Sequence, residues 1–282
     1  MLDQETGAVA SRPQSKYRVP ECDLIVRHKN PDTTSDLVMP VHLVCNTPDE
    51  VLIANIKANS AVADREWVSS VPAHDGIALV CGSGPSLGDD LGTIDDLHKN
   101  GATIFAMNGA ASFLASKGLW ADCQVIADAR EQTGDLVGPA RVHIFANQVH
   151  PSLFEKVPDA KLLHVNSYED HEQFYKLIEE FGTPQLIIGS HGSVGNVSLA
   201  LAFAMGFRNI HVFGFDSSFR NEAGHAFSQP MNVSEPVCQV EYAGKQYQCT
   251  ITMKSQAEVF PRLAYELEQM GATFTVHGSG FL

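Results

Sequence analysis

The sequence has no hydrophobic run long enough to cross a membrane. Its 282 residues contain no stretch of about 18 consecutive apolar residues, and the first 20 residues lack the apolar core of a signal peptide. We therefore expect a cytoplasmic protein without a membrane span. The length suffices for one large or two small domains and for a substantial core.

Basic residues are scarce as well. The chain has 19 Lys and Arg against 33 Asp and Glu, which gives a formal net charge of −14. This balance argues against a protein whose main role is to coat nucleic acid or an anionic membrane, although it does not exclude a local basic cleft. The sequence leaves a homo-oligomer open.

Closely spaced cysteine pairs are also missing. The six cysteines are Cys22, Cys45, Cys81, Cys123, Cys238 and Cys249, and no two have CxxC spacing. At least three of them fall in apolar, strand-like segments, and no His/Cys cluster has the spacing of a zinc site. We expect reduced core thiols, not zinc ligands or a disulfide framework.

A glycine-containing turn follows the apolar run Gly76 to Val80 directly. Because glycine has no Cβ, the turn Cys81 to Leu87 can bring backbone amides close to a phosphate. It lacks the lysine of a Walker loop, and Leu87 stands where a dinucleotide fingerprint needs a third glycine. A tight strand-to-helix connection without a ligand is the alternative. The candidate nucleotide-binding residues are Gly82, Ser83, Gly84, Pro85 and Ser86.

Short apolar runs alternate with helical stretches from residue 76 onward. Several runs are apolar throughout, as expected for strands buried on both faces of a parallel sheet. The sequence therefore predicts an α/β fold with a doubly wound, mainly parallel, Rossmann-like sheet. The expected strands are Ile77 to Cys81, Thr103 to Met107, Cys123 to Ala127, His143 to Ala146, Lys161 to Val165, Gln185 to Ile188, Asn209 to Phe213 and Thr273 to His277.

The chain is expected to have three parts. Residues 1–18 are polar and aperiodic, which predicts a flexible arm. Residues 19–72 predict a small α+β subdomain of two strands and a helix, with Thr47 as N-cap and Pro48 at the first helical position. Residues 75–282 form the Rossmann-like domain.

A helix over Val194 to Met205 is apolar around its whole circumference and is therefore expected to be buried. Its start offers unpaired amides and the positive end of the helix dipole, which makes it a second anion site. The candidate residues there are Gly192, Ser193, Gly195 and Asn196. Farther on, Cys238 to Thr250 predicts a hairpin, and Ser255 to Glu258 forms a capping box that would begin the last helix.

Ligands of open α/β sheets bind beyond the carboxyl ends of the strands. Asn108 follows a strand there and either contacts a nucleotide or caps the next helix. Asp128 and Asp216 follow two other strands, where a carboxylate serves as general base, ribose contact, metal ligand or merely as a turn residue. Mg²⁺ is left open as a cofactor, with Asp128 and Asp216 as its ligands if it is used.

Histidine is the remaining candidate for acid–base chemistry. His225 lies in a long polar loop after Asp216, and an imidazole titrates near neutral pH. A structural role is the alternative, and His191 is the second candidate. No serine stands in a Gly-x-Ser-x-Gly elbow, which argues against a hydrolase triad.

Five motifs in this order resemble the hydroxymethylpterin diphosphokinase-like (MptE-like) family, which includes the flagellar motility accessory factors. They are Cys81 to Leu87, Asn108, Ala127 to Ala129, His191 to Asn196 and Gly206 to Asp216. The resemblance spans about residues 75–282 and implies a sialyltransferase-like fold. It also implies that the glycine turn, Asn108 and Gly192 to Asn196 hold a nucleotide.

The sequence departs from the related sialyltransferases at two points. Those enzymes carry Asn where this chain has Ser83, and a histidine base where it has Thr252 to Ser255. His225 is then the base from another loop, with Asp216 as an alternative and Asp128 as a third candidate. Features around His225 and over Met253 to Ala257 are similar to a phage-associated branch.

The leading hypothesis is a transferase, most simply a glycosyltransferase that moves a sugar from a nucleotide-activated donor to a hydroxyl acceptor. The alternatives are ATP-dependent diphosphoryl transfer to a pterin-like alcohol, a non-catalytic nucleotide or glycan sensor, and a phage enzyme that modifies nucleic acid. The sequence has no lysine or arginine cluster near the glycine turn to clamp a triphosphate, which weakens the case for the diphosphokinase.

Overall fold

The structure is a computed structural model, and it describes residues 24–26, 37–39, 47–62, 64–167, 171–182, 186–227, 237–242 and 244–282. The predicted arm at 1–18 lies outside these residues. Before residue 47, the structure describes only the strands β1 (Leu24–Val26) and β2 (Leu37–Met39), which pair antiparallel. No helix in the described part is both long and apolar enough to cross a membrane.

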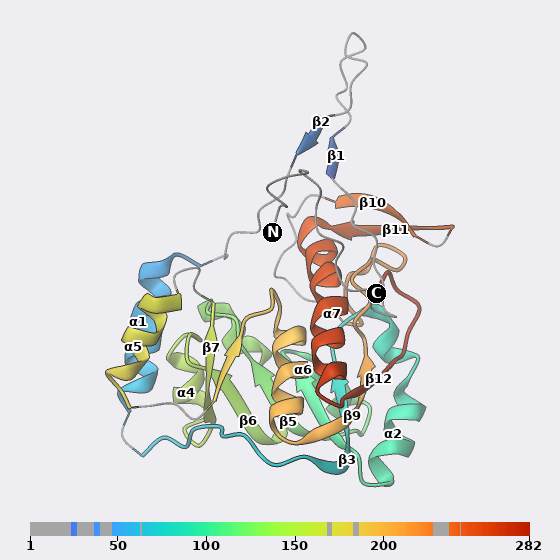
Figure 1. The fold of residues 1–282 in the computed structure, drawn as a ribbon. Coiled ribbons are helices and arrows are strands. Elements are labelled where there is room, and N and C mark those ends of the chain that lie inside the picture. Colours follow the sequence, from blue (N-terminus) through green and yellow to red (C-terminus); the bar gives the residue numbers. More distant parts are fainter. Residues whose placement is uncertain are drawn as a thin grey trace.

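An eight-stranded sheet forms the centre of the molecule (Figure 1). Its order is β12-β9-β3-β4-β5-β6-β7-β8, and every neighbouring pair is parallel. The strands are β3 (His74–Cys81), β4 (Thr103–Met107), β5 (Ala121–Ile126), β6 (Ala140–Ala146), β7 (Lys161–Asn166), β8 (Ile187–Gly189), β9 (Phe207–Phe213) and β12 (Thr273–Val276). The predicted α/β fold, with each of the eight expected strands, is therefore confirmed.

Helices cover both faces of this sheet. Alternate side chains of β3 point into two different hydrophobic cores. Ala78 and Val80 belong to the core that β3 shares with α6 (Val194–Ala204) and α7 (Ile251–Gln269). Leu79 and Cys81 belong to a second core with α2 (Leu91–Lys99) and α3 (Ala110–Ser116). All four side chains are fully buried, as in a strand that is covered on both sides.

Two helix starts differ from the sequence prediction. The α1 helix (Asp49–Ser60) has Pro48 as its N-cap, not Thr47, because the ψ of 146° at Pro48 is still extended. The α7 helix begins at Ile251, not at the Ser255 capping box. Thr250 ends β11 (Lys245–Thr250), and its hydroxyl accepts a hydrogen bond from the Met253 amide at 3.1 Å, so the helix starts where the strand stops.

The α1 helix is joined to the sheet through its polar side chains. The Nδ2 atom of Asn59 donates to the carbonyls of Asn147 and Val149 at 2.9 and 2.7 Å. Asn55 donates to the carbonyl of Gln148 at 3.0 Å. On its apolar side α1 packs against α5 (His171–Glu179). These bonds satisfy carbonyls that follow β6.

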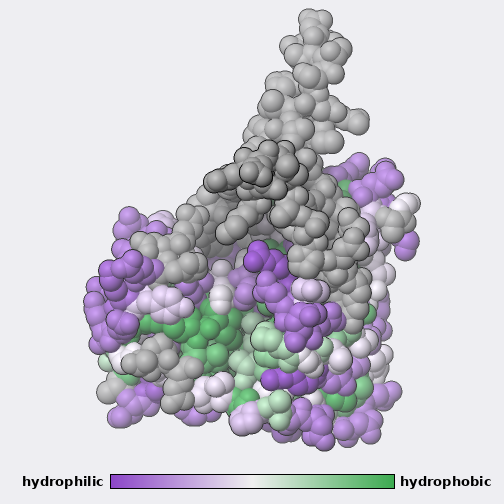
Figure 2. Space-filling view, viewed as in Figure 1, coloured by the Kyte–Doolittle hydropathy of each residue, from purple (hydrophilic) through white to green (hydrophobic). Residues whose placement is uncertain are grey.

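The remaining elements are short. They are the 3-10 helices η1 (Pro85–Gly88) and η2 (Glu131–Leu136), α4 (Ser152–Lys156) and β10 (Val237–Tyr242), which forms the predicted hairpin with β11. In Figure 2, which has the orientation of Figure 1, hydrophobic residues gather near β7, and hydrophilic residues lie to the left of them.

Candidate functional site

The sheet changes direction between β3 and β9. From β3 the chain adds strands on one side as far as β8, and it then returns through α6 to place β9 on the other side of β3. Parallel sheets bind ligands at such a switch point, beyond the carboxyl ends of the strands. The glycine turn follows β3 and Gly214 to Asp216 follow β9, so both lie at this point.

The amides of the glycine turn are mostly engaged within the protein. Gly82 N donates to Phe213 O and Gly84 N to Gly214 O, both at 2.8 Å. Ser86 N donates to Asp216 Oδ2 at 2.9 Å, and proline has no amide hydrogen. In the described part of the chain, Ser83 N is thus the one amide of residues 82–86 without a partner. This differs from the expectation that the whole turn offers amides to a phosphate, because the turn bonds to the end of β9.

The same packing explains the two glycines. A Cβ on Gly84 would lie 2.6 Å from Gly214 O and would also overlap the Asp216 carboxylate. A Cβ on Gly82 would overlap Gly214 O. Glycine is required here for the contact between β3 and β9, whatever else the turn does.

Asp216 anchors the turn. The residue is 5% exposed, and its Oδ2 atom accepts from both the amide and the hydroxyl of Ser86, each at 2.9 Å. Its backbone carbonyl accepts from the Phe281 amide at 2.8 Å. A buried carboxylate with these bonds serves to position Ser86, and this placement does not favour the predicted role as general base.

Asp128 lies apart from Asp216. Its carboxylate is paired with Arg130, with Nη2 to Oδ2 at 2.6 Å and Nε to Oδ1 at 3.0 Å. Two strands separate β5 from β9, which corresponds to about 14 Å at the usual spacing. The described residues contain no group of three or more His, Cys, Asp or Glu that could hold a metal. These two aspartates therefore do not fit a shared Mg²⁺.

Asn108 is strained and has an unsatisfied oxygen. Its φ of 49° is left-handed, a region that Asn tolerates better than most residues. Gly109, not Asn108, is the N-cap of α3, and no side chain caps that helix. Among the described residues the buried Oδ1 atom has no hydrogen-bond partner. An unpaired buried oxygen costs free energy, and since Asn108 does not cap α3, the nucleotide contact is the prediction that stays for this residue.

The loop after β9 brings His225 to the glycine turn. Ala226 N donates to Ser83 O at 2.9 Å, and His225 Nδ1 lies 3.4 Å from Ser83 Oγ. Phe227 of this loop stacks on Phe113 of α3 with the ring centroids 5.6 Å apart. Burial lowers the pKa of His225, so the imidazole is neutral at pH 7 and able to accept a proton.

The first turn of α6 lies at the same edge. Ser193 caps the helix by accepting from Asn196 N at 3.1 Å, and Asn196 Nδ2 donates to His191 O at 2.8 Å. Asn196 is 2% exposed, so it stabilises the turn before the helix. The amides of Val194 and Gly195 have no partner among the described residues, which leaves a dipole-favoured position for an anion.

Two residues that sequence reasoning did not select join these segments. Phe215 lies between the strand ends and α6, because a Cβ on Gly82 or on Gly195 would contact its ring at 3.1 or 2.9 Å. Gln256 of α7 donates through Nε2 to Gly192 O at 3.5 Å. Both residues lie within motifs that the sequence shows, Phe215 in Gly206 to Asp216 and Gln256 in Met253 to Ala257, but their contacts form only in the fold.

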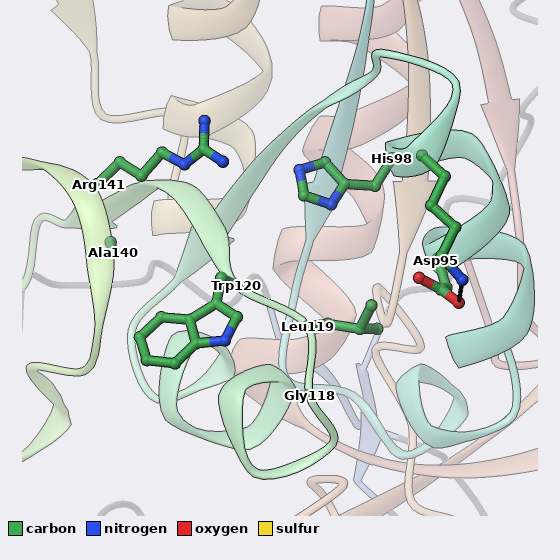
Figure 3. Close-up of a pocket in the computed structure, with 8 residues that line it drawn as sticks. Asp95, His98, Gly118, Leu119, Trp120, Ala140 and Arg141 are labelled. Carbon is green, nitrogen blue, oxygen red and sulfur yellow. Dashed lines mark hydrogen bonds and ion pairs between the residues drawn. The ribbon is translucent and has the colours of Figure 1, made fainter.

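A separate cavity of about 500 Å³ lies at the opposite edge of the sheet (Figure 3). It is lined by the end of α2, by Gly118 to Trp120 before β5, and by Ala140 and Arg141 at the start of β6. The cavity holds none of the predicted site residues. It lies at the amino ends of the strands, away from the switch point.

Two comparisons relate the chain to known proteins. A model of the family described as 6-hydroxymethylpterin diphosphokinase MptE-like matches residues 52–222. The solved structure of a MAf glycosyltransferase from Magnetospirillum magneticum AMB-1 is similar with a TM-score of 0.63 at 20% identity. The likeness covers 82% of this chain but only 36% of that chain, and it supports the fold. Among curated proteins, none matches.

Proposed function

The chain belongs to the 6-hydroxymethylpterin diphosphokinase MptE-like family, and from this premise we propose that it is a nucleotide-dependent transferase. We favour a glycosyltransferase that takes its sugar from a nucleotide-activated donor and passes it to a hydroxyl acceptor. The solved MAf glycosyltransferase has a similar fold, which supports this choice.

The observation that carries the proposal is the contact between His225 and Ser83. It joins the predicted base to the turn at the switch point, where parallel sheets hold their ligands. Asn108 follows the neighbouring strand and has an oxygen that receives no donor from any described residue. A neutral base, an unpaired acceptor and an anion-favouring helix start thus share one edge of the sheet.

Each of these groups would have a separate role in glycosyl transfer. The amides of Val194 and Gly195, with Ser83 N, would stabilise the negative charge that grows on the leaving phosphate oxygen. As the bond from the anomeric carbon to that oxygen breaks, the acceptor oxygen bonds to the same carbon. His225 takes the proton of the acceptor hydroxyl. Asn108 Oδ1 would accept from the base or the ribose.

Diphosphoryl transfer from ATP is the second candidate, because the family takes its name from that activity. It requires the negative charge of a triphosphate to be balanced. Three basic side chains on segments that carry site residues already have partners: Arg130 pairs with Asp128, Arg220 with Asp89 and Lys254 with Glu258. This placement favours the glycosyl reaction.

A thermal-shift screen tests nucleotide binding directly. We expect CMP, UDP or a related nucleotide or nucleotide sugar to raise the Tm. Indifference to every nucleotide and nucleotide sugar would refute the proposal. Release of AMP from ATP, abolished by a chelator, would instead identify the diphosphokinase.

A substitution of His225 tests catalysis. The His225→Asn protein is expected to keep the nucleotide-induced Tm shift and to lose at least 100-fold in turnover, the usual contribution of a general base. His98→Asn is the matched control, since His98 lies at the opposite edge of the sheet beside Asp122. Nucleotide binding by a wild-type protein that turns over no donor would support a sensor instead.

A further inference from the structure

Two cysteines face each other across the β10–β11 hairpin. Cys238 and Cys249 are directly opposite in the antiparallel register, and their Sγ atoms are 3.5 Å apart. Directly opposed residues in such a pair have Cα atoms about 4.5 or 5.5 Å apart, which lies within the range that a disulfide spans. We propose that Cys238 and Cys249 form a reversible intrachain disulfide under oxidation by a hydroperoxide.

The two thiols differ in access, and this sets the order of the steps. Cys238 is partly exposed, whereas Cys249 is fully buried against Val240, Ala257 and Phe281. The Cys238 thiolate therefore attacks the peroxide first: its sulfur bonds to one oxygen, the O–O bond breaks, and the other oxygen leaves as water or an alcohol after taking a proton. Cys249 then attacks the sulfenic sulfur, the S–S bond forms and hydroxide leaves as water. Two thiols are oxidised and one peroxide is reduced.

The hairpin is joined to the candidate site. Phe219 N, at the start of the loop that carries His225, donates to Gln248 O at 2.7 Å. Thr250, two residues after Gln248 in the same strand, caps α7. A disulfide one residue from each of these contacts would restrain the strand that holds the loop.

The other described cysteines are internal controls. Cys81 and Cys123 are buried, and burial raises their pKa, to about 12 for Cys123. Thiolate is scarce at such groups, so they react slowly with peroxide. No cysteine faces either of them across a strand in the registers that the structure describes.

Peptide mapping of the full-length protein tests the proposal. After mild hydrogen peroxide and a non-reducing digest, we expect the peptides of Cys238 and Cys249 to be linked, with a mass 2 Da below their sum, and to separate in dithiothreitol. The proposal is overturned if the peptides stay separate, if Cys238 ends as sulfinic acid, or if either residue links to a different cysteine.

A stability measurement adds a second readout. The bridge closes a short loop, and we expect the oxidised wild type to melt about 5 °C above the reduced protein. Hydrogen exchange at the Phe219 amide should slow in parallel. Cys238→Ser should show neither change, and equal Tm values for the oxidised and reduced wild type would count against the bridge.

Discussion

Replacing Gly84 by alanine should damage the contact between the glycine turn and β9. The φ of −64° at Gly84 suits alanine, so backbone strain plays no part. The added Cβ would lie 2.6 Å from Gly214 O and 3.0 Å from Asp216 Cγ, and it would overlap the Asp216 carboxylate. These neighbours are backbone and a buried, anchored side chain, so none of them moves cheaply.

The magnitude follows from what must shift. To make room, Asp216 must release Ser86 N and Ser86 Oγ, and a hydrogen bond to a charged group contributes about 1.5–3 kcal/mol. Overpacking of a tight site alone costs about 1–3 kcal/mol. Because the turn relaxes in part, we expect Gly84→Ala to lower the free energy of unfolding by about 3–5 kcal/mol.

Chemical and thermal unfolding measure this effect. A loss of that size corresponds to a Tm lower by roughly 5–9 °C in a chain of this length. Gly92→Ala is the matched control, because Gly92 lies in the first turn of α2 and no described atom comes within 4 Å of its Cβ position. Alanine there should leave the Tm equal or slightly higher. A Gly84→Ala protein that melts within 1 °C of the wild type would refute the packing argument.

Three further substitutions test the structure elsewhere. Ser193→Ala should lower the free energy of unfolding by about 1 kcal/mol in urea titrations, because it removes the α6 cap. Asn59→Ala should cost about 2–3 kcal/mol by the same assay, since two carbonyls lose their donor, and a loss below 0.5 kcal/mol would contradict the α1 contacts. Burial lowers the pKa of His164 to about 4, whereas the unfolded imidazole titrates near 6.5. As the pH falls, the imidazole is therefore protonated in the unfolded chain at a higher pH than in the folded protein. The folded state is favoured fully above pH 6.5, and about 3 kcal/mol of the free energy of unfolding is lost as the pH falls towards 4. His164→Gln should therefore remove about 3 kcal/mol of the acid sensitivity between pH 7 and pH 4, and an unchanged pH profile would refute this.

The fold was predictable because its signals are local. The β4 strand and the second half of β3 are apolar runs that end at a turn, and burial on both faces follows from that composition. The start of α7 was not predictable in the same way. Two competent caps occur five residues apart, and Thr250 is the one used because the hairpin delivers it in an extended conformation.

The location of the candidate site was predictable from the rule that ligands bind beyond the carboxyl ends of the strands, but its hydrogen bonds were not. That rule placed the glycine turn, Asn108 and α6 at one edge, but it could not say which donors the protein itself uses. Three amides of the turn bond to Phe213 at the end of β9, to Gly214 and to Asp216. A sequence pattern cannot separate a glycine that admits a phosphate from one that admits a neighbouring strand. The amides of Ser83, Val194 and Gly195 have no partner among the described residues, and they are therefore the donors that we expect a phosphate at this edge to use. Substitutions that remove the N–H group of Ser83, Val194 or Gly195 should weaken nucleotide binding. They should not cause the loss of folding stability that is expected for Gly84→Ala.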